Sequence, residues 1–167
     1  WDEEWGDAPR VIVRAPAGRG RAQTAPGIGD RVLARLSEDK AKGGFVGDHV
    51  NKSAFVKLLD GLRKEPAKRG KDPFGDTPSS EIRKAQWAAH HSDGKSDAHT
   101  IVSMAIERFS AALFDVIERY RASDEEWRKV QRIAVGAGFS EGRLGELVVA
   151  RVQKLLHDEQ VKCEIKP

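Results

Sequence analysis

The sequence predicts a mainly helical α/β protein with a C-terminal βαβ unit and an N-terminal β-ribbon arm. Apolar residues recur at helical spacing over residues 97–121, and a strand, a glycine turn, a helix and a second strand follow one another over 132–165. Leu, Ile, Val and Phe account for seven of the first 44 residues but for 31 of the remaining 123. We therefore expect an arm at residues 1–43 and a folded domain at residues 44–167.

The arm is predicted to contain two short strands. Arg10-Val-Ile-Val-Arg14 is a β-branched run, which is typical of a strand. A Pro/Gly/Arg stretch then ends in turn residues at 26–30 and leads to Arg31-Val-Leu-Ala-Arg-Leu36, whose apolar residues alternate. The two strands would form the ribbon.

The first helices of the domain follow a glycine break at residues 43–44. Asn51 is placed to begin a helix that carries Phe55, Leu58, Leu59 and Leu62 on one face. Prolines, glycines and cations over 63–76 predict a loop. Thr77-Pro78 then predicts an N-cap and first-turn proline for a second helix through Trp87, which ends over residues 90–94.

The long helix at 97–121 is the predicted spine of the fold. Its 25 residues would span roughly 37 Å at about 1.5 Å per residue. The stripe comprises Ile101, Val102, Ala105, Ile106, Phe109, Ala112, Leu113, Val116, Ile117 and Tyr120. Ser123 to Glu126 form a capping-box pattern that predicts a short helix with Trp127.

The end of the chain predicts a parallel βαβ unit. A strand at 132–135 precedes a Gly136-Ala137-Gly138 turn, a helix through Leu156 and a strand at 161–165. Two strands joined by a helix are normally parallel.

Composition excludes several classes of protein. The sequence has no run of 18 apolar residues and no apolar stretch after a basic N-terminus, so no membrane span or secretory signal is predicted, and we expect a cytoplasmic protein. A single cysteine, Cys163, excludes a disulfide framework and a Cys-rich zinc site. Because it alternates with Val161 and Ile165, we expect it to be buried.

The turn at Gly136, Ala137 and Gly138 is the candidate nucleotide site. Small residues between a strand and a helix allow close approach of a phosphate to the helix N-terminus. Glu141 stands where the dinucleotide fingerprint requires a third glycine, so a nicotinamide cofactor is not expected. A tight turn without a ligand and a nucleotide contact both remain open.

The arm carries the second candidate site, for RNA. Arg10, Arg14, Arg19, Arg21, Arg31 and Arg35 face a single acid, Asp30, over the same stretch. Guanidinium groups on a ribbon neutralise phosphates, and such binding weakens steeply with salt. Aromatic residues that stack on bases are absent between Val11 and Gly44, so a solvated basic loop is the competing interpretation.

A group of histidines is the candidate metal site. His90, His91 and His99 lie near Asp93 and Asp97 in the sequence. Adjacent histidines at a helix end are usually solvated, and we predict no metal site.

One resemblance covers residues 44–167. The segments that carry it are Gly44-Phe-Val-Gly-Asp48, Asn51-Lys-Ser-Ala-Phe55, Asp72-Pro-Phe-Gly-Asp76 and, above all, residues 132–151 from Arg132-Ile-Ala-Val-Gly-Ala-Gly-Phe-Ser. Together they resemble part of the bacterial ROK-type proteins, which are sugar kinases and related regulators. The resemblance implies an actin-like, ribonuclease-H-like ATPase fold, with the turn at 136–138 on the ATP side of the cleft.

The sequence departs from that family where catalysis is concerned. The Asp-Gly-Gly-Thr-like phosphate loop, the catalytic aspartate and the Cys/His zinc site are not found in it, so no catalytic residue is assigned. Residues 9–14 and 25–36 are also similar to the approach to a cold-shock-type OB module of ribonuclease R, which would make the chain a composite.

The preferred prediction is a truncated or divergent ROK-like sugar-kinase module that contacts a nucleotide but does not catalyse alone. An RNA-binding module is the first alternative. An oligomeric interaction or scaffold protein is the second, and it is favoured if the long helix exposes part of its stripe. A start at Trp1 and an end at Pro167, directly after a predicted strand, are typical of a fragment. Fragment, fusion and complete protein all remain open.

Overall fold

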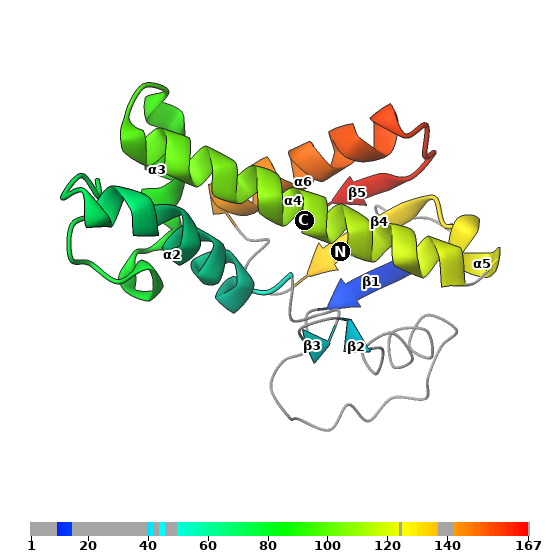
Figure 1. Ribbon diagram of the computed structural model, residues 1–167. Coiled ribbons are helices and arrows are strands. Elements are labelled where there is room, and N and C mark those ends of the chain that lie inside the picture. Colours follow the sequence, from blue (N-terminus) through cyan, green and yellow to red (C-terminus); the bar gives the residue numbers. More distant parts are fainter. Residues whose placement is uncertain are drawn as a thin grey trace.

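A computed structural model describes residues 10–14, 40–41, 44–45, 50–123, 125–136 and 142–166. The helices are α2 (Lys52–Lys68), α3 (Lys84–Asp93), α4 (Asp97–Ser123), α5 (Glu125–Arg128) and α6 (Gly142–Asp158), with a 3-10 turn η2 (Ser79–Glu81). The strands are β1 (Arg10–Arg14), β2 (Lys40–Ala41), β3 (Gly44–Phe45), β4 (Arg132–Gly136) and β5 (Glu164–Lys166). The described part is therefore mainly helical with a small parallel sheet (Figure 1).

The sheet confirms the predicted βαβ unit. β4 and β5 pair in parallel, with Ile133 opposite Ile165, and α6 connects them. Because Ile133 and Ile165 are buried, this face of the sheet belongs to the core. Gln153 of α6 also binds the backbone of this last segment. Its side chain accepts a hydrogen bond from the Ile165 amide at 2.8 Å and donates one to the Cys163 carbonyl at 3.1 Å.

Helix α4 is the spine, as its periodicity predicts. It runs through the middle of the view in Figure 1, from α3 to α5, and contacts α2, α3, α5 and α6. Phe109 packs edge-on against Phe55 of α2, with ring centroids 5.6 Å apart, and Phe55 in turn lies 5.2 Å from the ring of Trp87 in α3. At the other end, Tyr120 stacks on Trp127 at 5.0 Å.

The apolar stripe of α4 is covered within the chain. Its members from Ile101 to Tyr120 are buried, apart from Ala112, which is partly buried. Among the residues that the structure describes, Met104 is the one large hydrophobic side chain recorded as exposed. The exposed stripe that would favour the scaffold alternative is thus not found in the described part.

The structure corrects the prediction for residues 10–14. β1 pairs in parallel with β4, so this strand belongs to the sheet of the folded domain and not to a separate arm. The physical reason lies in Val11-Ile12-Val13, because a continuous β-branched run is typical of a parallel strand covered on both faces. The predicted second strand of the ribbon, 31–36, lies outside the described residues, so the ribbon is unsupported.

Two predicted boundaries before α4 are also wrong. α2 begins after Asn51, whose side chain accepts the Ala54 amide at 2.9 Å as predicted, but it continues through Pro66 to Lys68 instead of ending before residue 63. Thr77-Pro78 does not open a helix. The 3-10 turn η2 follows it, and α3 begins only after Arg83, whose amide donates to the Gln86 side chain at 2.9 Å.

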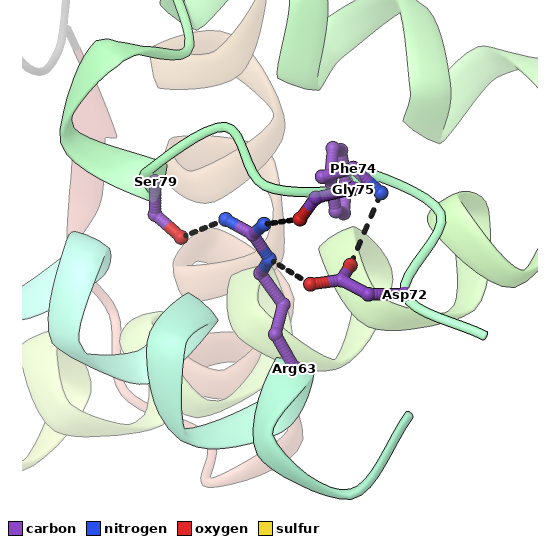
Figure 2. A network of polar contacts seen from close by, with 5 residues as sticks. All are labelled: Arg63, Asp72, Phe74, Gly75 and Ser79. Carbon is purple, nitrogen blue, oxygen red and sulfur yellow. Dashed lines mark hydrogen bonds and ion pairs between the residues drawn. The ribbon is translucent and has the colours of Figure 1, made fainter. Parts of the chain in front are cut away.

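A buried arginine holds the segment between α2 and α3 in place. Arg63 of α2 donates from Nε to Asp72 at 2.9 Å, from Nη1 to the Ser79 hydroxyl at 2.8 Å and from Nη2 to the Gly75 carbonyl at 3.1 Å (Figure 2). The guanidinium also lies over the ring of Phe74, and the Phe74 amide donates to the second oxygen of Asp72. This network holds the segment from 72 to 79 against α2.

Candidate functional site

The candidate site lies where β4 ends and α6 begins. Gly136 is the last residue of β4, opposite Arg14 of β1, so this end of the glycine turn is the carboxyl end of a parallel strand. Ala137 and Gly138 lie outside the described residues. α6 begins at Gly142, which has a φ of +78°, a conformation that side-chain-bearing residues rarely adopt.

A groove opens beside this helix start. It has a volume of about 470 Å³ and lies between α3 and the first turn of α6. Its lining residues are Lys84, Ala85, Ala88, Ala89 and Ser92 from α3, and Gly142, Arg143 and Leu144 from α6. Three of these lining residues are alanines, and a lysine and an arginine contribute positive charge.

Arg143 is the cation that α6 brings to the groove. Its side chain is 65% exposed and pairs with Glu146 three residues later at 3.0 Å. An exposed ion pair of this kind contributes little to stability, so the guanidinium can exchange its partner for a ligand at small cost. The first amides of any α-helix also lack partners within the helix, and the helix dipole favours an anion there.

A polar cluster of His91, His99 and Ser103 joins α3 to α4. His91 is the residue before Ser92, which lines the groove. The rings of His91 and His99 stack with centroids 5.4 Å apart and planes inclined by 24°. The Ser103 hydroxyl lies 3.0 Å from His91 Nδ1 and 3.4 Å from His99 Nε2. His99 Nδ1 donates to the His91 carbonyl at 2.6 Å.

The surroundings of His91 disfavour its protonated form. Burial lowers the pKa of His91 below its usual value, and the nearby His99 and Arg143 lower it further. His91 is thus electrostatically linked to the arginine that lines the groove.

The remaining sequence predictions have mixed outcomes. Cys163 is buried, as expected, and burial raises the pKa of its thiol. His90 packs its ring edge-on against Phe74 at 5.2 Å, so it does not join the other two histidines. In the part of the chain that the structure describes, no cluster of three His, Cys, Asp or Glu side chains could hold a metal ion.

The predicted RNA site is only partly described. Arg10 and Arg14 stand at the two ends of β1. Arg19, Arg21, Arg31 and Arg35 lie outside the described residues, so the structure does not bring the six together. Within the described segments, no helix has the length and apolarity needed to cross a membrane.

Comparison with known proteins adds no assignment. No family model matches the chain, and neither the curated proteins nor the solved structures contain a significantly similar one. The site must therefore be interpreted from its own geometry.

Sequence reasoning located the glycine turn but not the groove beside it. Arg143 follows the turn closely and could have been noted as a cation in the first turn of a helix. Lys84 and the alanines of α3 gave no comparable signal, because only the packing of α3 against α6 brings them to the first turn of α6.

Proposed function

We propose that this chain is a nucleotide-binding module, in which the nucleotide occupies the α3–α6 groove with its phosphates at the junction of β4 and α6. One observation carries the proposal. The groove includes the first turn of α6, the helix that follows β4 in the chain, and ligands of open parallel sheets bind outside the carboxyl ends of the strands.

The phosphate end of the ligand is supported by charge. Arg143 and Lys84 line the groove from two different helices, and the helix dipole of α6 adds partial positive charge between β4 and the ligand. A guanidinium can bind two oxygens of a phosphate at once, whereas the contact between Arg143 and Glu146 is a single one, from Nη1 to Oε2 at 3.0 Å. Glu146 then gives up Arg143 when the ligand binds.

The base end is supported by shape. Ala85, Ala88 and Ala89 lie along one side of α3 and leave its backbone free of bulky side chains. Ser92, which also lines the groove, donates its hydroxyl to the Ala88 carbonyl at 3.0 Å. A flat heterocycle can lie against this surface. We therefore favour a nucleotide over an isolated phosphate as the ligand. The resemblance to ROK-type kinases implies that the base is adenine.

Catalysis is not part of the proposal. Phosphoryl transfer needs groups that position the acceptor and neutralise charge on the transferred phosphate, and the sequence offers no Asp-Gly-Gly-Thr-like loop for that purpose. The resemblance to ROK-type kinases therefore supports nucleotide contact, with ATP or ADP as ligand, in a divergent or truncated module.

Calorimetry with ADP and ATP tests the proposal. We expect saturable binding, and we expect Arg143→Gln to weaken it roughly tenfold, the loss typical of a hydrogen bond to a charged group. Ala89→Phe should abolish binding by filling the groove.

The matched controls are Arg151→Gln and Ala111→Phe. Arg151 is a second arginine of α6 that pairs with Glu107 at 2.7 Å, and Ala111 is an exposed alanine of α4. Both variants should bind like the wild type. Absence of binding heat from a folded wild-type sample would reduce the turn at 136–138 to a structural role.

RNA binding through the six arginines of residues 10–35 stays a prediction. RNA affinity that falls steeply with salt would support it, and salt-insensitive or absent binding would remove it.

A further inference from the structure

Helix α2 carries a row of lysines on the side that faces away from the core. Lys57, Lys64 and Lys68 are exposed, whereas Phe55 and Leu59 of the same helix are buried. Spacings of seven and four residues place the three lysines on one face of an α-helix, opposite the buried side chains. We call these three lysines the lysine ridge. At about 1.5 Å per residue, the ridge is roughly 16 Å long.

Two further cations extend the ridge past the end of α2. Arg69 and Lys71 are exposed, and the chain turns back between them at Gly70, whose φ is +64°. The Lys71 amide donates to the Pro66 carbonyl at 2.9 Å, which keeps Lys71 beside the last turn of α2. The ridge therefore continues into a backbone that hydrogen bonds hold in place.

Few acids offset this charge. Between residues 57 and 71 the sequence has six cations, of which Arg63 is buried, against two carboxylates, Asp60 and Glu65. Glu65 pairs with Lys68 at 2.7 Å, and both side chains are largely exposed, so this pair contributes little to stability. The ridge and its extension thus present a linear surface of positive charge.

Gly61 makes a notch in the middle of the ridge. It follows Lys57 by four residues and precedes Lys64 by three, so it shares their side of the helix. A glycine inside a helix is destabilising relative to alanine. Within the described part of the chain, no neighbouring atom lies within 4 Å of the place that a Cβ would take at Gly61. The described fold therefore does not require a glycine here, and the notch is open to a ligand.

The charge of this surface favours a polymer of phosphates over other partners. A nucleic-acid duplex carries one negative charge per roughly 1.7 Å of its axis, which suits a row of cations that is roughly 16 Å long. Single strands bind where their bases stack on aromatic rings, and none of the ridge residues is aromatic. Protein interfaces are poor in lysine and centre on apolar anchors. Among the described residues, the one large hydrophobic side chain recorded as exposed is Met104, on another helix.

The notch argues against a membrane surface. A bilayer is flat on the scale of one missing side chain, so it would gain nothing from the notch. The backbone of a duplex is a narrow, convex chain of phosphates, and it can come closer to the helix where a side chain is missing.

We propose that the lysine ridge of α2, together with Arg69 and Lys71, binds the phosphate backbone of a nucleic-acid duplex, and that the notch at Gly61 lets this backbone approach the helix. Contacts to phosphates carry no sequence information, so binding is independent of base sequence. The ridge shares no residue with the α3–α6 groove or with the arginines of residues 10–35. The inference therefore stands independently of the proposed function.

Fluorescence anisotropy of the full chain with a short labelled DNA duplex, over a range of salt concentrations, tests the inference. We expect Lys64→Gln to weaken binding about eightfold at about 0.1 M salt, the factor by which the release of one counterion favours binding relative to 1 M salt. The slope of log affinity against log salt should become shallower by about one. Lys154→Gln, at an exposed lysine of α6, should bind like the wild type.

Variants at Gly61 separate binding from folding. Gly61→Ala and Gly61→Leu should raise the midpoint of urea denaturation, because both residues favour a helix and a Cβ has room there. Gly61→Leu should nevertheless weaken duplex binding roughly threefold. It moves the phosphates away by a few ångströms, a sizeable part of the screening length of roughly 10 Å at 0.1 M salt. A lower urea midpoint for Gly61→Ala would show that the fold itself requires the glycine, and the notch would lose its role.

Other outcomes overturn the inference as a whole. Duplex affinity that is unchanged in both Lys64→Gln and Gly61→Leu would place the binding elsewhere, for example on the arginines of residues 10–35. Equal or tighter binding of phosphatidylserine vesicles would assign the ridge to a membrane surface, and tighter binding of a single strand would exclude the duplex. Absence of duplex binding at low salt would reduce the ridge to a solvated face, whatever the result with ADP.

Discussion

Two arginines of this protein, Arg63 and Arg143, differ in burial and in the number of partners that they bind. The side chain of Arg63 is 8% exposed, and each of its three nitrogens donates to a group of the same chain. Arg143 is 65% exposed, its recorded partner is a surface glutamate on the same helix, and it borders a groove of about 470 Å³. The two cations lie in the same helical domain, but only the second has room for a ligand.

The difference separates a structural cation from a binding one. Burial of a guanidinium is tolerated only where its donors are satisfied, and those bonds fix the surrounding backbone. A cation at the rim of a groove fixes nothing in the fold and keeps its bonding capacity for an anion. Nucleotide binding is therefore proposed at Arg143, not at the larger network around Arg63.

The largest expected effect comes from removing the buried cation. Arg63→Met leaves Asp72, whose side chain is 9% exposed, without its charge partner. Loss of one member of a buried ion pair typically costs about 3–5 kcal/mol, and urea denaturation should show a loss of this size. Lys64→Met, at the next and exposed position of α2, should stay within about 0.5 kcal/mol of the wild type.

The double variant Arg63→Met, Asp72→Asn sharpens the result. Because the two residues interact directly, the combined loss should be smaller than the sum of the single losses. Additive losses, or a stable Arg63→Met protein, would contradict the structural role of the network.

The same network shows what sequence reasoning could and could not reach. Periodicity was sufficient to predict α4, and the order of β4, α6 and β5 was sufficient to predict the parallel unit. Each of these elements has a local sequence pattern of its own. Arg63 lies in a charged, proline-containing stretch with no local sign of burial. Its bonds to Asp72 and Ser79 are tertiary contacts, and they tie the segment between α2 and α3 to α2.

The candidate site was likewise predicted from sequence only in part. The strand and the helix on either side of the glycine turn were predicted from sequence alone, and the site at Gly136, Ala137 and Gly138 stays a prediction. The groove depends on how α3 packs beside α6, and the pairing of His91 with His99 and Ser103 depends on the angle between α3 and α4. Neither relation is encoded in a spacing along the chain.

The smallest expected effect on stability is that of Arg143→Gln. Its exposed pair with Glu146 contributes little, so the free energy of unfolding should change by no more than about 0.5 kcal/mol. Urea denaturation in the absence of nucleotide measures this directly. A loss as large as that of Arg63→Met would show that Arg143 serves the fold, and the contrast between the two arginines would disappear.

The most direct test of nucleotide binding in the α3–α6 groove is an amide NMR titration of the wild-type protein with ADP. We predict that the signals of residues 142–144 and of Lys84, Ala88 and Ser92 move progressively to saturation. The signals of Asp72, Gly75 and Ser79, around Arg63, should stay in place. Shifts centred on the Arg63 network, or none in the first turn of α6 at saturating ADP, would contradict the account.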